Sequence, residues 1–159
     1  MISPWKFFYP LDSIGSWNRI YGRRGFTQYQ CVLPVEKDAG IVRRFFEVMA
    51  SRGGASYLTG VKDCGAEGKG MLSFPKPGIT IALDIPMRVG KTQALTDALN
   101  EVVIPAGGRI YLTKDALTRP DHFRAMEPRL DAWLAVRKKW DPDGKIRSAQ
   151  SVRLFGDKA

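Results

Sequence analysis

Apolar residues between positions 28 and 52 change their spacing from every second residue to every third or fourth. Residues 28–34 alternate, which predicts a strand with one buried face, formed by Tyr29, Cys31 and Leu33. Residues 37–52 carry one apolar stripe at helical spacing and therefore predict an amphipathic helix. The members of that stripe are Ile41, Val42, Phe45, Val48 and Met49.

The two periods repeat further along the chain. Strands are expected at 55–62, 79–85 and 109–113, with residues 71–74 also extended, and a second helix is expected at 91–104. The buried side of this helix is expected to hold Ala94, Leu95, Ala98, Leu99, Val102 and Val103. The order strand, helix, strand, strand, helix, strand predicts an α+β fold. Specifically, we expect a ferredoxin-like antiparallel sheet with both helices on one face.

The two flanks of this domain differ from it. Seven large aromatic side chains stand in residues 5–26 without regular spacing, which is typical of an irregular segment that packs on something else. Residues 119–136 are helical in pattern, interrupted by Pro128 and followed by a turn and a basic tail. We therefore divide the chain into an interface segment at 1–27, an α+β domain at 28–114, and C-terminal helices with a tail at 115–159.

Composition narrows the class of protein. Hydrophobic residues make up 44% of the 159 residues, enough for a packed core, and no apolar run reaches the roughly 20 residues of a membrane span. Two cysteines and one histidine make a poor metal site, so no metal is expected. The net charge of +9 is compatible with nucleic acid, anionic lipid or a phosphorylated substrate as the partner.

Several segments, taken in order, carry a family resemblance. They are residues 8–12, 17–22, 25–30, 72–75 with 77–78, 107–115 and 137–142. Together they resemble the C-terminal part of FAD-linked oxidases of the vanillyl-alcohol-oxidase type, most of all the decaprenylphosphoryl-β-D-ribose oxidase branch. No single motif is specific, but the ordered set covers nearly the whole chain.

The resemblance implies the substrate-binding portion of an FAD-dependent enzyme that oxidises a sugar CH–OH group and passes the hydride to flavin N5. FAD would be bound mainly by an N-terminal domain or subunit, absent from this chain, on which residues 1–27 and 115–159 would pack. The isolated chain is then expected to be inactive. Its substrate would be a sugar or a polyprenyl-phosphate sugar, nucleic acid is not an expected partner, and the expected location is cytoplasmic, with peripheral contact to the inner membrane left open.

The same resemblance implies site residues. Lys114 would be catalytic and would lie at the flavin, with Tyr111 and Ala82 beside the ring. Substrate contacts would come from Gln30, Gln28, Lys62, Leu11 and Thr80. Mycobacterial members carry a cysteine at the position of Ala82, so the alanine leaves the identity of the sugar open.

Two alternatives remain. A sugar-1,4-lactone oxidase of the arabinono- or gulonolactone type shares the architecture, and like the first hypothesis it requires a separate flavin-binding domain. A stand-alone basic ferredoxin-like module that binds nucleic acid belongs to another class. That module would bind nucleic acid by itself and in a salt-sensitive way.

Overall fold

A four-stranded antiparallel sheet forms the centre of the computed structural model, which describes residues 3–10, 14–36, 38–54 and 56–158. The strands are β1 (Phe26–Leu33), β2 (Thr59–Cys64), β3 (Gly78–Pro86) and β4 (Arg109–Ile110), in the spatial order β2-β3-β1-β4. Each βαβ half thus encloses a strand of the other half. The predicted α+β fold and its ferredoxin-like element order are confirmed.

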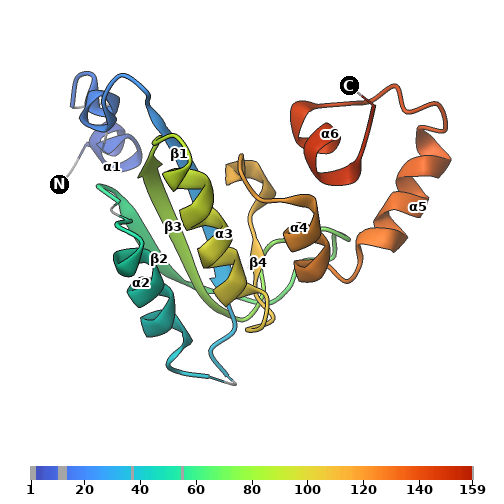
Figure 1. The fold of residues 1–159 in the computed structure, drawn as a ribbon, viewed down its shortest axis with the longest axis horizontal. Helices are drawn as coiled ribbons and strands as arrows, with labels where there is room; N and C mark the ends of the chain where they lie inside the picture. The colour runs from blue at the N-terminus through green and yellow to red at the C-terminus, as the bar shows by residue number, and fades with distance from the viewer. Residues whose placement is uncertain (1–2, 11–13, 37, 55, 159) are drawn as a thin grey trace.

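Two helices, α2 (Ile41–Ser51) and α3 (Lys91–Val103), cover one face of the sheet, as predicted (Figure 1). Helix α2 begins at Ile41 rather than at residue 37 because a turn precedes it. In that turn the Gly40 N–H donates to Asp38 Oδ1 at 2.8 Å, and the Ile41 N–H donates to the Asp38 carbonyl at 3.2 Å. Both predicted helices are confirmed, and their other boundaries lie within one residue of those predicted.

The core lies between these helices and the sheet, and one predicted position on α3 is wrong. Ala94 is exposed, whereas Asn100 is fully buried. The Asn100 amide oxygen accepts from the Tyr29 hydroxyl at 2.9 Å, and its nitrogen donates to Thr118 Oγ1 at 3.2 Å. An apolar pattern cannot predict a buried amide, because its burial depends on partners that are distant in sequence.

Three predicted extended segments differ in the structure. Residues 71–74 are not a strand: the Ser73 carbonyl accepts from the Arg109 guanidinium at 2.7 Å, and Phe74 stacks on Tyr111 with ring centroids 4.7 Å apart. The last strand, expected at 109–113, ends at Ile110 and gives way to the 3₁₀ helix η3 (Leu112–Lys114). The strand expected at 55–62 is β2, which begins at Thr59 and ends at Cys64.

Glycine is required where the chain passes the end of β1. Gly78 has a φ of +146°, and a Cβ there would lie 2.2 Å from the Leu33 carbonyl oxygen. A Cβ at Gly108 would lie 2.5 Å from the Val32 carbonyl oxygen and 2.8 Å from Val103 Cγ1. Both positions let neighbouring backbone approach β1 closely, which no other residue type permits without a shift.

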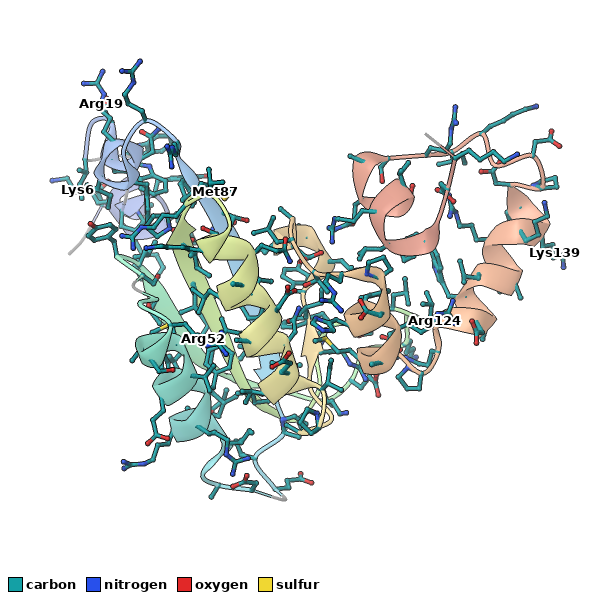
Figure 2. All side chains as sticks on the ribbon, viewed as in Figure 1. Lys6, Arg19, Arg52, Met87, Arg124 and Lys139 are labelled. Atoms are coloured by element: carbon teal, nitrogen blue, oxygen red, sulfur yellow. The ribbon has the colours of Figure 1, made fainter. Side chains whose placement is uncertain are left out.

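The opening segment contains two short helices, although the sequence predicted irregular structure. They are α1 (Pro4–Phe8) and the 3₁₀ helix η2 (Trp17–Tyr21). Helix α1 has no buried residue, and Trp5 and Phe8 are 65% and 70% exposed. Figure 2 shows Lys6 and Arg19 at the same end of the molecule. The segment therefore presents aromatic and cationic side chains on its surface.

The C-terminal part consists of α4 (Pro120–Met126), α5 (Leu130–Trp140) and α6 (Ala149–Phe155), beyond the β4 edge of the sheet (Figure 1). The break at Pro128 confirms the predicted interruption. The expectation of a tail after residue 144 is wrong in part, because α6 forms there with Ser148 and Ser151 as a reciprocal capping box. Among the described residues no helix combines the length and apolarity of a membrane span.

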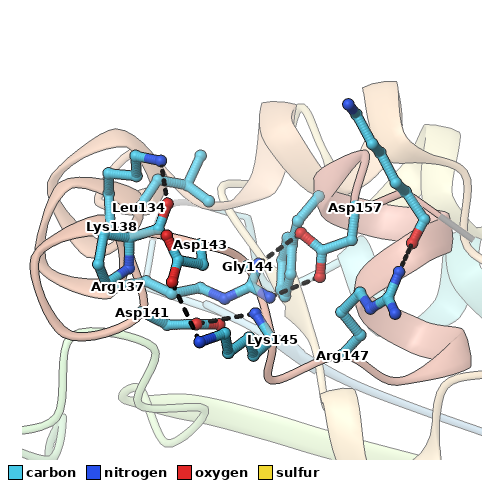
Figure 3. A pocket seen from close by; sticks show the side chains of 12 residues that line it. Leu134, Arg137, Lys138, Asp141, Asp143, Gly144, Lys145, Arg147 and Asp157 are labelled. Atoms are coloured by element: carbon cyan, nitrogen blue, oxygen red, sulfur yellow. Dashed lines mark hydrogen bonds and ion pairs between the residues drawn. The ribbon is translucent and has the colours of Figure 1, made fainter.

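A hollow of about 670 Å³ separates α5 from the end of the chain, and its charges are largely paired with one another (Figure 3). The Arg137 guanidinium donates to both oxygens of Asp157, at 2.8 and 2.5 Å, and lies 5.7 Å from the centre of the Trp133 ring. Lys138 donates to the Pro142 carbonyl. The contacts that line this hollow therefore hold α5 against the segment that follows α6.

The Arg137–Asp157 pair predicts a loss of stability in acid. The hydrogen bond from Arg137 lowers the pKa of Asp157 to about 2. Because the folded pKa lies below the unfolded value of about 3.9, the pair stabilises the fold above pH ~4 and this contribution disappears as the pH falls towards 2. Urea unfolding at a series of pH values should show a shallower acid dependence for Asp157→Asn than for the wild type. Asp143→Asn is the matched control, and equal slopes for the two variants would contradict the prediction.

Candidate functional site

The face of the sheet away from α2 and α3 carries a row of polar side chains. In the register of β1 and β3, Gln28 lies opposite Asp84 and Gln30 opposite Ala82. Since successive residues of a strand point to opposite faces, these positions share the side opposite to the core residue Tyr29. The sheet therefore uses one face for the core and carries these polar side chains on the other.

The second edge of this row comes from β2. Lys62 lies opposite Thr80, and Gly60 lies opposite Ala82. A hollow of about 210 Å³ forms over this face. Its lining includes six of the residues expected from the resemblance, namely Gln28, Gln30, Lys62, Thr80, Ala82 and Lys114. The structure thus brings together side chains from three strands and from η3.

The two glutamine amides are held in fixed orientations. Gln28 Nε2 donates to Asp84 Oδ1 at 3.0 Å, and Gln30 Nε2 donates to Thr80 Oγ1 at 3.0 Å. Thr80 in turn donates to the Cys31 carbonyl at 2.9 Å. No described residue donates to the Oε1 atom of either glutamine. Both oxygens are thus available to accept a hydrogen bond from a ligand hydroxyl.

The charges around the hollow favour an anionic ligand. Lys62 and Lys114 both line it, and neither forms a salt bridge with a carboxylate of the described residues. The single carboxylate in the lining, Asp84, is 4% exposed and already accepts from Tyr21 and Gln28. Two cations beside one satisfied carboxylate leave a positive field, which attracts an anion such as a phosphate.

Lys114 is positioned by the C-terminal helix α6. Gln150 Nε2 donates to the Leu112 carbonyl at 2.6 Å and to the Asp115 carbonyl at 3.2 Å. Arg153 donates to the Asp115 carboxylate at 2.7 Å. These bonds fix both ends of η3, the short helix that carries Lys114, onto α6. The sequence did not predict these contacts, because they join residues more than 30 positions apart and because α6 was expected to be part of a tail.

One expected site residue, Tyr111, lies elsewhere, and another, Leu11, is not among the described residues. Tyr111 stacks on Phe74 and lines a separate hollow of about 330 Å³. It is not part of the lining around Lys114, and its place beside a flavin stays a prediction. Leu11 lies outside the described residues, so its substrate contact also stays a prediction.

The sequence reasoning missed Asp84 and its partner Tyr21. Asp84 had a visible signal, because it interrupts an apolar strand at the same alternation as Thr80 and Ala82. Tyr21 had none: its hydroxyl reaches Asp84 Oδ2 at 3.2 Å from a residue 63 positions away in the chain. The rim of the hollow also includes Leu58, Thr59 and Gly60, which precede or open β2.

Comparison with known proteins shows several relatives, among them the following two. The chain is 39% identical over 149 residues, 94% of its length, to decaprenylphosphoryl-β-D-ribose oxidase of Mycolicibacterium smegmatis, and the match covers 32% of that protein. It is 35% identical over 130 residues, 82% of its length, to an uncharacterized protein in the mprA 5′ region of Streptomyces coelicolor, of which the match covers 35%. No protein-family model matches the chain.

These matches confirm the resemblance found in the sequence. The chain spans about a third of the length of the curated relatives it matches. The match is consistent with a C-terminal fragment of an FAD-linked oxidase.

Proposed function

We propose that this chain, homologous over nearly its whole length to about a third of an FAD-linked oxidase, is the substrate-binding part of an enzyme that oxidises a CH–OH group of a sugar. The observation that carries the proposal is the hollow on the open sheet face. Six side chains expected there from the resemblance line a single cavity, and they combine two amides with two cations. That combination suits a phosphorylated polyol.

In this proposal the chain's residues bind and orient the substrate. The Oε1 atoms of Gln28 and Gln30 accept hydrogen bonds from sugar hydroxyls, and the Lys62 ammonium pairs with the phosphate. Lys114 approaches the reacting end and stabilises negative charge that develops during oxidation. FAD, when bound, supplies the acceptor for the hydride that leaves the sugar carbon.

The donor set also fits a flavin ring over this face. A cation near the electron-rich edge of the ring is a recurring way in which proteins stabilise the reduced form, and Lys114 has that chemistry. The phosphates of FAD would be held by the part of the enzyme that this chain does not match. Polyprenyl phosphate is the proposed anionic group on the sugar, which is the chemistry named for the mycobacterial relative.

The proposed partner is the flavin-binding part of the enzyme, and we place its docking surface on the opening segment. Trp5, Phe7 and Phe8 are between 65% and 70% exposed, an unusual amount of aromatic surface to leave in water. Both relatives are more than twice as long as this chain, and the additional protein would cover this surface.

A chimaera tests the function. This chain replaces the homologous third of the Mycolicibacterium oxidase, and the product is examined for bound flavin and for its reduction by a phosphorylated ribose or a sugar lactone. Reduction by the ribose compound is the expected result. A chimaera that binds flavin but reacts only with the lactone would favour the sugar-lactone oxidase instead. Salt-sensitive binding of an oligonucleotide by the chain alone, without flavin reduction in the chimaera, would favour the nucleic-acid module.

Hydrogen exchange tests the proposed docking surface. Backbone amides in residues 3–10 and 14–20 should exchange fast in the isolated chain and become protected in the chimaera, because few buried contacts hold these residues in place. Amides of β1 and β3 serve as the internal control and should exchange slowly in both proteins. Equal protection of the segment and these strands in the isolated chain would show an autonomous domain and contradict the prediction.

A further inference from the structure

We propose that Tyr21 is a positioning residue of the hollow: it holds the Asp84 carboxylate, which in turn holds the Gln28 amide. The opening segment then contributes to the geometry of the ligand site as well as to the proposed docking surface for the flavin-binding part. This inference rests on the proposed function for its ligand, but the chain of contacts from Tyr21 to Gln28 is testable without one.

Tyr21 is held firmly in place although it lies in a surface segment. It is 6% exposed, and its ring stacks on Phe26 with centroids 4.4 Å apart and packs edge-on against Tyr57 at 5.4 Å. Its hydroxyl donates to Asp84 Oδ2 at 3.2 Å. Burial and the neighbouring Asp84 carboxylate raise the pKa of Tyr21 to about 12, so the phenol keeps its proton at neutral pH.

Asp84 connects this phenol to the ligand side of the sheet. Its two carboxylate oxygens have different donors: Tyr21 on Oδ2 and Gln28 Nε2, at 3.0 Å, on Oδ1. Its backbone N–H is fixed by the Ser56 hydroxyl at 3.0 Å and the Leu58 carbonyl at 3.2 Å. The backbone of Asp84 is therefore rigid, and the side-chain donors set the direction of the carboxylate.

Loss of the Tyr21 hydroxyl would change the hydrogen bonding of Gln28. A buried carboxylate that loses a donor must recruit another, because an unsatisfied buried charge is costly. The lining of the hollow contains other donors, namely the amides of Gln28 and Gln30, the hydroxyls of Thr59 and Thr80, and the ammonium groups of Lys62 and Lys114. All of these except the Thr59 hydroxyl belong to residues expected in the ligand site. A replacement donor from that set would move part of the site, so Tyr21 acts on the ligand through Asp84.

The first test uses the full 159-residue chain and no ligand. Tyr21→Phe removes the hydroxyl and keeps the aromatic packing. Tyr57→Phe is the matched control, because Tyr57 touches the same ring cluster but its hydroxyl bonds to no described residue. We expect the side-chain amide resonances of Gln28 to shift in Tyr21→Phe and to stay in place in Tyr57→Phe, with core resonances unchanged in both. Unchanged Gln28 resonances in a folded Tyr21→Phe chain would overturn the inference.

A second variant, at Asp84, tests the same contacts without relying on the Tyr21 substitution alone. Asp84→Asn should also shift the Gln28 amide resonances, and adding Tyr21→Phe to it should produce no comparable further shift, because the phenol acts only through the carboxylate. Fully additive shifts would mean that Tyr21 affects Gln28 by another route, which also overturns the inference.

Ligand affinity separates this inference from the proposed function. We expect the wild-type chain to bind ribose 1-phosphate, and Tyr21→Phe to bind it about three- to tenfold more weakly, while Tyr57→Phe matches the wild type. Equal affinities for all three proteins would refute the positioning role and leave the proposed function standing. Absence of wild-type binding, together with a shifted Gln28 amide, would count against the proposed ligand and would support the contact between Tyr21, Asp84 and Gln28.

Discussion

Replacing Lys114 by methionine in the chimaera is expected to slow reduction of its flavin by the sugar substrate about 10²–10³-fold. Methionine keeps the length and apolar stem of lysine but removes the charge that we propose stabilises the transition state. The backbone around residue 114 is fixed by Gln150 and Arg153 of α6, so the substitution should leave the fold intact. Stopped-flow reduction measures the rate, and thermal melting reports the fold.

Two further variants sharpen this experiment. Lys114→Arg should restore only part of the rate, because a planar guanidinium does not occupy the place of an ammonium. Lys139→Met, on the far helix α5 (Figure 2), is the matched control and should react at the wild-type rate. If Lys114→Met were reduced as fast as Lys139→Met, Lys114 would be an ordinary surface lysine and its catalytic assignment would be wrong.

Phe45→Ala should lower the free energy of unfolding of the chain by about 3–5 kcal/mol. The Phe45 side chain is fully buried between α2 and the sheet, where it stacks on Tyr29 at 6.2 Å and meets Phe46 edge-on at 5.8 Å. Removing the ring loses its transfer free energy and leaves a cavity that the fixed β-sheet cannot close. Urea unfolding followed by circular dichroism gives the change.

The matched control is the same substitution on the surface. Phe8 is 70% exposed on α1, so Phe8→Ala should change the free energy of unfolding by no more than about 0.5 kcal/mol. A similar loss for both variants would mean that α1 packs on the chain in solution far more than the structure shows. A small loss for Phe45→Ala would place the core elsewhere than between α2 and the sheet.

The sequence by itself determined the central strands and helices and their buried faces. The alternation along β1 placed Tyr29, Cys31 and Leu33 in the core and left Gln28 and Gln30 on the opposite face, because side chains of a strand alternate whatever they pack against. The apolar stripe of α2 likewise predicted its buried side. These properties depend on local spacing, which the chain carries wherever it folds. The family resemblance then assigned chemistry to the open face.

Only the tertiary structure decided which distant groups meet there. Tyr21 and Asp84 join across 63 positions, and α6 reaches back to fix the segment that carries Lys114. Asn100 replaces Ala94 on the inner side of α3 for the same reason, since its partners come from β1 and from the segment before α4. A polar side chain is buried where its hydrogen-bond partners arrive, and those arrive through sheet register and helix packing, which no local spacing of residues encodes.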